Sequence, residues 1–321
     1  MNKPKVELAH IIERFGNEFV EKHKPNTWQL RTLNALRICR TAALGGHKEQ
    51  CDHCGTVRYS YNSCKNRHCP KCQASRQAFW IEDVSERILD TKYFHIVFTL
   101  PEALNEICLL NSRQFYSLMF SSVWQTLRTF GYTHYGVESG ALAILHTWGQ
   151  NLSLHPHIHC LVPAAGLDLS GKMKKIGKKG KYLYPVRKLS IDFRSLMMKK
   201  LKKQLKDAGI LPEYQRTIDL SWKKDWVVYV EPSFADARRV IKYLGRYTHR
   251  VAISNHRIKS IDGEKVSFMY KDYRDGSKQK LMTLDGVEFL RRFAMHILPK
   301  GFVKVRYYGI MSNRYQKHTA M

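Results

Sequence analysis

The sequence predicts an α+β protein, in which an N-terminal helical, metal-binding module precedes a domain built on an antiparallel sheet. Three observations support this fold class. Apolar residues recur at helical spacing in the first 45 residues, and five cysteines lie within residues 51–72. Beyond residue 90, short β-branched and aromatic runs alternate with helical stretches, and some are joined as hairpins. Strands joined by hairpins favour an antiparallel sheet over a doubly wound parallel one.

The N-terminal module begins with an amphipathic stretch. Residues 7–45 are predicted to be helical, because apolar side chains recur three or four positions apart, at Leu8, Ile11, Ile12, Phe15, Phe19 and Val20. A second helix is expected after Asn26, over 28–42, and the pair Gly45–Gly46 ends it. Another helix is expected after the cysteines, over 77–89.

The central part of the chain alternates strands with long helices. The run YFHIVFTL predicts a strand over 93–100, which Pro101 ends. A long helix is expected to follow, to about residue 130. Two further strands, over 141–148 and 158–162, are expected to form a long hairpin through the loop 149–156.

The C-terminal third continues this pattern. The lysine- and glycine-rich segment 172–181 predicts a solvated loop. The remaining predicted helices cover 190–208, 234–248 and 285–297, and the remaining strands cover 226–230 (ended by Pro232), 251–258, 265–270 and 303–308. Asp262–Gly263 is a hairpin turn signal between two of these strands. The predicted domains are 1–90, 91–260 and 261–321, the last a hairpin–helix–strand extension.

The charge of the chain points to a polyanionic partner. Among 321 residues, Lys and Arg number 54 and Asp and Glu 27, so the formal net charge is +27. Nucleic acid is the default partner of such a protein, and an anionic membrane surface is the alternative. The 44% hydrophobic content excludes a disordered tail. We expect a cytoplasmic protein without a membrane segment, because no apolar run of about 18 residues and no signal-peptide pattern is present.

Paired cysteines predict a structural zinc site. Cys51–x2–Cys54 and Cys69–x2–Cys72 form two knuckles, and two knuckles supply four thiolates in a tetrahedron. Cys64 and His68 lie in the same segment and are alternative ligands. With these two residues spare, the binding of a second ion stays an open alternative. Basic residues, including Arg67 and Lys71, lie beside the cysteines, so we expect the module to contact DNA phosphates.

A second candidate metal site is the run LHPHIHC. His157 and His159 alternate on a predicted strand, so they face the same side and are expected to hold one divalent cation. His146, on the preceding strand, is the third candidate ligand, and Gln150 is the next. Chance spacing is the simplest alternative. A cupin would need a Glu soon after the pair, and an amidohydrolase would need eight βα units; neither is present.

The segment after Pro232 carries two candidate nucleophiles. Tyr243 and Tyr247 are one helical turn apart, beside a row of cations made by Arg239, Lys242, Arg246 and Arg250. Cations neutralise a DNA strand, and a phenolate is able to attack phosphorus and leave later. The alternative is that the tyrosines belong to the hydrophobic core.

These features, in this order, resemble the IS91-type transposases, the zinc-bearing members of the HUH endonuclease superfamily. The resemblance rests on YNSCKNRHCPKCQ (61–73), HPHIHCLVPAAGL (155–167) and the tyrosine pair in KYLGRYTHRVAISNHRI. It implies a ferredoxin-like, RRM-type nuclease domain in which His157 and His159 bind metal and Tyr243 and Tyr247 are nucleophiles. It also implies a longer C-terminus than this chain has.

The resemblance implies a catalytic Mg²⁺ or Mn²⁺ besides the structural Zn²⁺, and single-stranded DNA and transposon-end DNA as partners. The implied activity is DNA nicking and strand transfer through a 5′-phosphotyrosine, as in rolling-circle transposition. A replication initiator or relaxase of the same superfamily is one alternative, and a non-enzymatic zinc-ribbon DNA-binding regulator is another. No feature of the sequence specifies an oligomeric state.

Overall fold

The computed structural model describes residues 4–177, 183–234, 245, 251–273, 275–312 and 315. Its contacts divide the chain into two compact units, each assembled from separate segments. Unit 1 comprises Met1–Phe79, Trp148–Leu154 and His249–Lys300. Unit 2 comprises Trp80–Thr147, His155–Thr248 and Gly301–Met321. This division differs from the predicted boundaries after residues 90 and 260, because the segment 249–300 shares a core with the N-terminal helices.

Unit 1 is held together by helices from both ends of its sequence. These are α1 (Leu8–His23), α2 (Thr27–Arg37) and α9 (Gly286–Ala294). The apolar stripe of α1 lies in one buried cluster with Phe289, Leu290 and Phe293 of α9. A capping box begins α2, in which the side chains of Asn26 and Gln29 each accept a hydrogen bond from the other residue's backbone N–H. The helix ends at Arg37, earlier than predicted.

Three strands complete the core of unit 1. They are β9 (Ile258–Asp262), β10 (Lys265–Asp272) and β11 (Lys278–Asp285), in the antiparallel order β11-β10-β9. The predicted turn at Asp262–Gly263 is confirmed, and Gly263 has φ +50°. The prediction of a strand over 251–258 is wrong, because β9 begins only at Ile258, after the short 3₁₀ helix Asn255–Arg257.

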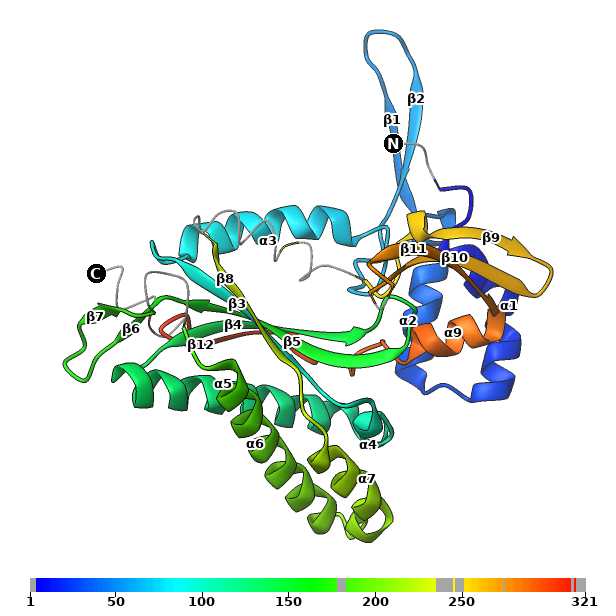
Figure 1. Ribbon diagram of the computed structural model, residues 1–321. Helices are drawn as coiled ribbons and strands as arrows, with labels where there is room; N and C mark the ends of the chain where they lie inside the picture. Colours follow the sequence, from blue (N-terminus) through cyan, green and yellow to red (C-terminus); the bar gives the residue numbers. More distant parts are fainter. Residues whose placement is uncertain are drawn as a thin grey trace. The chain divides into compact units, whose positions relative to one another are not determined.

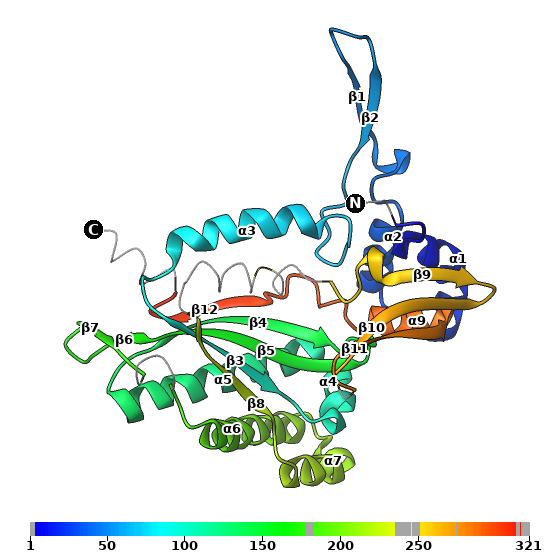
Figure 2. The same ribbon diagram turned by 45° about the horizontal axis from the view of Figure 1, so that its top comes forward.

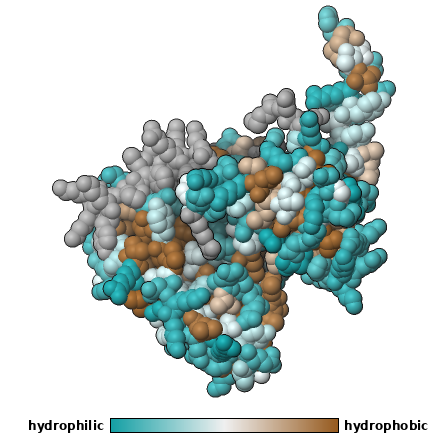
Figure 3. All heavy atoms as spheres, turned by 45° about the vertical axis from the view of Figure 1, so that its right-hand side comes forward, coloured by the Kyte–Doolittle hydropathy of each residue, from teal (hydrophilic) through white to brown (hydrophobic). Residues whose placement is uncertain are grey.

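A second hairpin of unit 1 carries part of the cysteine segment. It consists of β1 (Gly46–Gln50) and β2 (Val57–Tyr61), and all ten residues are exposed. In Figures 1 and 2 it extends away from α1 and α2 of the same unit. Figure 3 shows brown hydrophobic atoms among teal hydrophilic ones along it, and the exposed apolar side chains here include Val57, Tyr59 and Tyr61.

Unit 2 is built on a five-stranded sheet with the order β12-β4-β5-β3-β8. Its strands are β3 (Tyr93–Thr99), β4 (Gly140–Trp148), β5 (Leu154–Pro163), β8 (Val228–Phe234) and β12 (Val305–Gly309). Along the chain, helices lie between β3 and β4 and again between β5 and β8. The hairpin of β4 and β5 joins these two strand–helix–strand segments. The expected antiparallel sheet is present: β3 pairs antiparallel with both β5 and β8, and β12 with β4.

Pro232 does not end the eighth strand as predicted, because β8 continues to Phe234. This strand lies at the edge of the sheet, where a residue without a backbone N–H is tolerated. Its register with β3 also shifts between Tyr93 and His95, which marks a bulge.

Helices cover both faces of this sheet (Figures 1 and 2). One face packs on α5 (Ser112–Tyr135) and α6 (Val186–Asp207), where Phe98 of β3 contacts Phe193 of α6 at a ring-centroid distance of 5.0 Å. On the other face, Leu142, Ile144 and Leu161 form a cluster with Val84 of α3 (Gln73–Arg87).

The remaining elements of unit 2 are smaller. They are α4 (Asn105–Leu110), α7 (Leu211–Lys223), and the pair β6 (Ala165–Leu167) and β7 (Met173–Lys175). The single long helix predicted from residue 101 is divided, because Asn111 ends α4 and its side chain caps α5 by accepting from the backbone N–H of Gln114. Among the described residues, no helix is both long and apolar enough to cross a membrane.

Candidate active site and zinc cluster

Three histidines meet on the α3-side face of the unit 2 sheet. His146 lies near the end of β4, and His157 and His159 alternate on the neighbouring strand β5. One ring nitrogen from each lies within 4.8 Å of the others, and the ring centroids are 4.6–5.3 Å apart. His146 and His159 are buried and His157 is half-buried, so the cluster has one partly open side.

Hydrogen bonds orient two of these imidazoles. The Nδ1 of His157 lies 2.7 Å from the backbone oxygen of His155, which accepts its proton. The Nδ1 of His159 lies 2.8 Å from Nε2 of His95, on strand β3. Nδ1 takes part in a hydrogen bond in both rings, so Nε2 is the candidate ligand atom of each.

His95 is itself held by a carboxylate. Its Nδ1 lies 2.8 Å from Oε2 of Glu231, on strand β8. Burial lowers the pKa of His95, and the hydrogen bond with Glu231 acts in the opposite direction. Sequence reasoning missed both residues. The alternation of β3 was the one available signal for His95, because it places a polar residue on the same face as buried Tyr93.

The donor set of the histidine cluster suits a divalent transition-type cation. Neutral imidazole nitrogens bind Mn²⁺, Fe²⁺, Co²⁺ or Zn²⁺ more readily than Mg²⁺, which prefers oxygen ligands. The partly open side at His157 would leave room for oxygen ligands from water or a phosphate. The residues present therefore fit a divalent metal ion, and Mn²⁺ fits this donor set better than Mg²⁺.

Four cysteines meet in unit 1, but they are not the four predicted from spacing. Cys39, Cys64, Cys69 and Cys72 place their sulfur atoms within 4.8 Å of one another. The Cys39–Cys72 and Cys64–Cys72 sulfur distances are 3.6 and 3.7 Å. A tetrahedral zinc with bonds of about 2.3 Å requires sulfur–sulfur distances of about 3.8 Å. The cluster fits a structural zinc ion.

The surroundings of the cluster favour thiolate at one position. A hydrogen bond with Cys69 lowers the pKa of Cys64 to about 5, whereas burial raises the pKa of Cys39 to about 11. The backbone N–H of Asn66 also donates to the Cys64 sulfur, at 3.5 Å. Zinc binds thiolates, so the lowered pKa of Cys64 agrees with a metal-binding role for this cluster.

Comparison with protein families gives two matches that together cover most of the chain. A model described as "Transposase zinc-binding domain", of the IS91 type, matches residues 11–100. A model described as "Putative transposase" matches residues 140–319, more than half of the chain. The chain belongs to the IS91-type transposase family.

Two relatives agree with this IS91-type assignment. The chain is 46% identical over 326 residues to the putative transposase y4qJ of Sinorhizobium fredii, covering 97% of this chain and 81% of the relative. It is 28% identical over 314 residues to the transposase for insertion sequence element IS801 of Pseudomonas savastanoi pv. phaseolicola, covering 95% and 74%. No solved structure matches the chain.

In this IS91-type transposase the two remaining predicted zinc ligands lie apart from the cluster. Cys51 and Cys54 are exposed, in the turn that joins β1 to β2. In place of Cys51 and Cys54, the structure brings Cys39 and the alternate candidate Cys64 together with Cys69 and Cys72. The antiparallel pairing of β1 and β2 places the Cys51–Cys54 knuckle at their turn, and Cys39 follows the end of α2. The alternate ligand His68 is not part of the four-sulfur group.

The predicted DNA-contacting residues of the zinc module have roles inside unit 1. Lys71 forms an ion pair with Glu7, at 2.6 Å, and donates to the backbone oxygen of Cys39. Arg67 is half-buried, and burial together with the charge of Arg76 lowers its pKa. Their contact with DNA stays a prediction.

The predicted tyrosine helix lies outside the residues that the structure describes. This applies to both candidate nucleophiles, Tyr243 and Tyr247, and to the cations Arg239, Lys242, Arg246 and Arg250. Their roles stay predictions.

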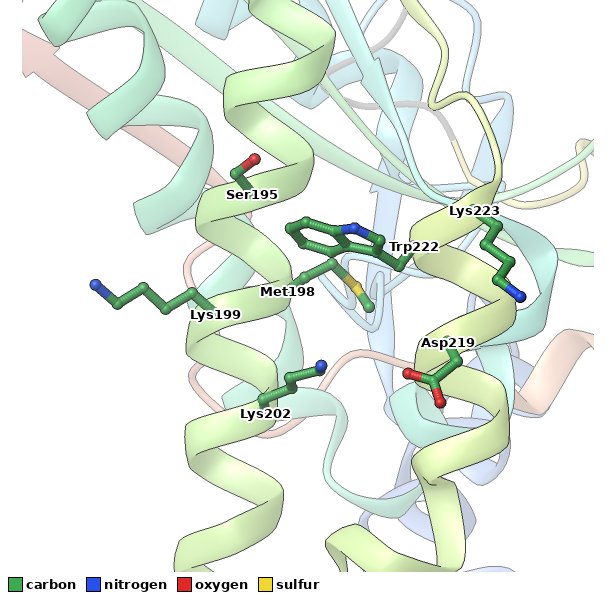
Figure 4. Close-up of a pocket in the computed structure, with 7 residues that line it drawn as sticks. All are labelled: Ser195, Met198, Lys199, Lys202, Asp219, Trp222 and Lys223. Atoms are coloured by element: carbon green, nitrogen blue, oxygen red, sulfur yellow. The ribbon is translucent and has the colours of Figure 1, made fainter.

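A cavity of about 450 Å³ lies elsewhere in unit 2, between α6 and α7. Figure 4 shows Trp222 reaching from α7 towards Met198 of α6, with Lys202 and Asp219 pointing into the space between the helices. None of the clustered histidines lines it, and α6 packs on the opposite face of the sheet from them. The cavity is therefore separate from the candidate active site.

Proposed function

We propose that the chain nicks single-stranded DNA at transposon ends and transfers the cut strand through a 5′-phosphotyrosine. The observation that carries this proposal is the cluster of His146, His157 and His159, in a chain of a transposase family. Family membership implies DNA binding, and the net charge of +27 agrees with it.

We further assign unit 2 to the ferredoxin-like class of the HUH nucleases. The strand order supports this. Without the edge strand β12, the sheet order is β4-β5-β3-β8, and the chain order is strand, helix, two strands, helix, strand. The histidine pair then lies on a strand flanked on both sides.

In the proposed site, His157 and His159 bind a divalent ion together with His146. When bound, Mn²⁺ or Mg²⁺ polarises a non-bridging oxygen of the scissile phosphate and offsets the charge that develops there. The protein fixes the ligand geometry through the Nδ1 hydrogen bonds of His157 and His159. Rigid strands hold these side chains in place before DNA arrives.

The proposed nucleophile is the phenolic oxygen of Tyr243 or Tyr247. It forms a bond to phosphorus, the bond from phosphorus to the 3′ oxygen breaks, and the proton lost by the phenol is matched by one gained at the departing 3′-OH. One ester replaces another, so a later attack by a 3′-OH is able to rejoin the strand without an external energy source. A second tyrosine would make a second cut while the first remains bonded to DNA.

The transposase names of both relatives support transposition over plasmid replication or conjugation for this chemistry. A non-enzymatic zinc-ribbon regulator would not require the histidine cluster. The geometry of that cluster therefore favours the enzyme.

The test is a covalent-adduct assay. Purified protein is mixed with labelled single-stranded DNA from each flank of its gene, with Mn²⁺ or Mg²⁺, and run on a denaturing gel. We expect a metal-dependent shifted band that the double variant Tyr243→Phe/Tyr247→Phe lacks. Full strand transfer by that variant would overturn the nucleophile assignment.

A second variant separates chemistry from DNA binding. His157→Ala is expected to lose at least a hundredfold in cleavage while keeping most DNA affinity. His134→Ala, which changes a histidine of α5 outside the cluster, is the matched control and should cleave normally. Normal cleavage by His157→Ala would place the metal site elsewhere.

A further inference from the structure

A series of hydrogen-bonded side chains, His159, His95 and Glu231, connects the histidine cluster across three strands. Sheet register pairs His95 of β3 with Glu231 of β8 on one side and with Leu161 of β5 on the other. His159 is two residues from Leu161, so it is the diagonal neighbour of His95 on the same face. His95 and His159 are 2% and 7% exposed, and their rings are nearly parallel, with an interplanar angle of 2°.

Hydrogen-bond chemistry allows one proton arrangement that leaves this cluster able to bind a cation. A carboxylate accepts, so Nδ1 of His95 donates to Glu231. If Nε2 of His95 also carried a proton, Nδ1 of His159 would have to accept it, and the remaining proton of His159 would occupy Nε2. With Nε2 of His95 as the acceptor, Nδ1 of His159 donates and its Nε2 keeps a lone pair for the metal.

We propose that Glu231 and His95 are positioning residues of the metal site, which fix the tautomer and ring orientation of His159. This inference rests on the proposed function, because it requires the histidine cluster to bind a cation. Neither residue belongs to the three-histidine group itself. They act through His159 alone.

The two ligands of β5 are therefore supported differently. His157 is oriented by a carbonyl oxygen of its own strand, which a side-chain substitution does not remove. His159 depends on two side chains from two other strands. Changes at Glu231 or His95 should weaken one ligand and leave the other intact. Partial loss of metal affinity is the expected signature.

The test measures binding of Mn²⁺ alone to the purified full-length chain, by the electron paramagnetic resonance of free Mn²⁺. Glu231→Ala and His95→Phe are each expected to weaken Mn²⁺ binding by about 10- to 100-fold. This is the range typical when a residue that hydrogen-bonds to a metal ligand is removed. Glu231→Gln keeps an acceptor oxygen and should lose less than Glu231→Ala. Melting temperature and zinc content are expected to stay within the range of the control variant.

Glu138→Ala is that matched control. The side chain of Glu138 is 23% exposed, against 26% for Glu231, and it lies in the same unit away from the histidines. Glu231 is exposed enough for a small anion to enter, so added acetate should restore part of the Mn²⁺ affinity of Glu231→Ala and none of His95→Phe. A role limited to folding would show no such rescue.

The outcomes separate this inference from the proposed function. If the wild type binds Mn²⁺ and His159→Ala does not, the metal site stands. Wild-type affinity in Glu231→Ala and Glu231→Gln would then overturn the positioning role alone. If His159→Ala binds Mn²⁺ as well as the wild type, the proposed metal site fails as well. Should His95→Phe not fold, the two Glu231 variants and the acetate rescue decide the question.

Discussion

At the scale of single residues, the cluster of Cys39, Cys64, Cys69 and Cys72 sets a clear test of zinc binding. Cys39→Ser or Cys64→Ser is expected to reduce zinc from about one ion per chain to nearly none, because each removes one of four ligands. The double variant Cys51→Ser/Cys54→Ser should keep its zinc, since both residues are exposed in a hairpin turn. Mass spectrometry of the metal in purified protein decides between them. Zinc loss in the double variant with retention in Cys39→Ser would reverse the assignment.

Residue-scale prediction succeeded where a local pattern was enough. The alternation HIH placed His157 and His159 on one face, and the predicted hairpin brought His146 beside them. For the zinc cluster, prediction named Cys69, Cys72 and, as an alternate, Cys64. It missed Cys39, which is 12 positions upstream of the nearest knuckle, at the end of a helix. Glu231 could not be linked to His159 from one sequence, because strand order decides which side chains meet.

At the scale of elements, the packing of α9 on α1 depends on a glycine. A Cβ at Gly286 would overlap the ring of buried Phe15. We therefore expect Gly286→Ala to lower the free energy of unfolding by about 1–3 kcal/mol, as overpacking does. Urea unfolding of the two proteins measures it.

Gly16 of α1 provides the matched control. A Cβ there would meet only the Cγ2 of Ile12, at 3.8 Å, which is ordinary contact. Gly16→Ala should therefore be neutral or stabilise by up to about 1 kcal/mol, because alanine favours the helix. Equal effects of the two substitutions would show that α1 and α9 do not pack as described.

Elements with a strong periodicity in their own sequence were predictable. Elements that form a strand by pairing with another segment were not. The helix α6 and the strands β3 and β4 lie close to their predicted ranges. The hairpin of β1 and β2 was missed because β1, with the sequence GHKEQ, has no apolar residue, although Val57, Tyr59 and Tyr61 alternate in β2. Strand β11 was missed because its lysine-rich sequence, KQKLMTLD, is stabilised as a strand by pairing with β10.

At the scale of the whole molecule, one buried histidine should shape the dependence of stability on pH. Burial lowers the pKa of His296 to about 4, and its Nε2 lies 3.1 Å from the backbone oxygen of Leu152. The folded protein keeps this ring neutral, whereas the unfolded chain protonates it below about pH 6.5. Stability is therefore lost as pH falls from about 6.5 to 4, by roughly 2–3 kcal/mol from this residue.

His296→Gln keeps a donor for Leu152 and removes the titration. Denaturant unfolding at pH 7 and pH 4.5 should show a smaller loss on acidification for the variant than for the wild type. The comparison cancels the contributions of the other 14 histidines. An identical loss in both proteins would exclude His296 as a source of acid sensitivity.

The assembly of unit 1 from distant segments has a consequence for synthesis. Leu8, Ile11 and Phe15 leave the ribosome long before the residues of α9 that cover them, near position 290. Until then the nascent chain exposes an apolar helix that has no cover from α9. The newborn protein should therefore depend on chaperones, and a translation pause before residue 286 would prolong the interval in which it aggregates.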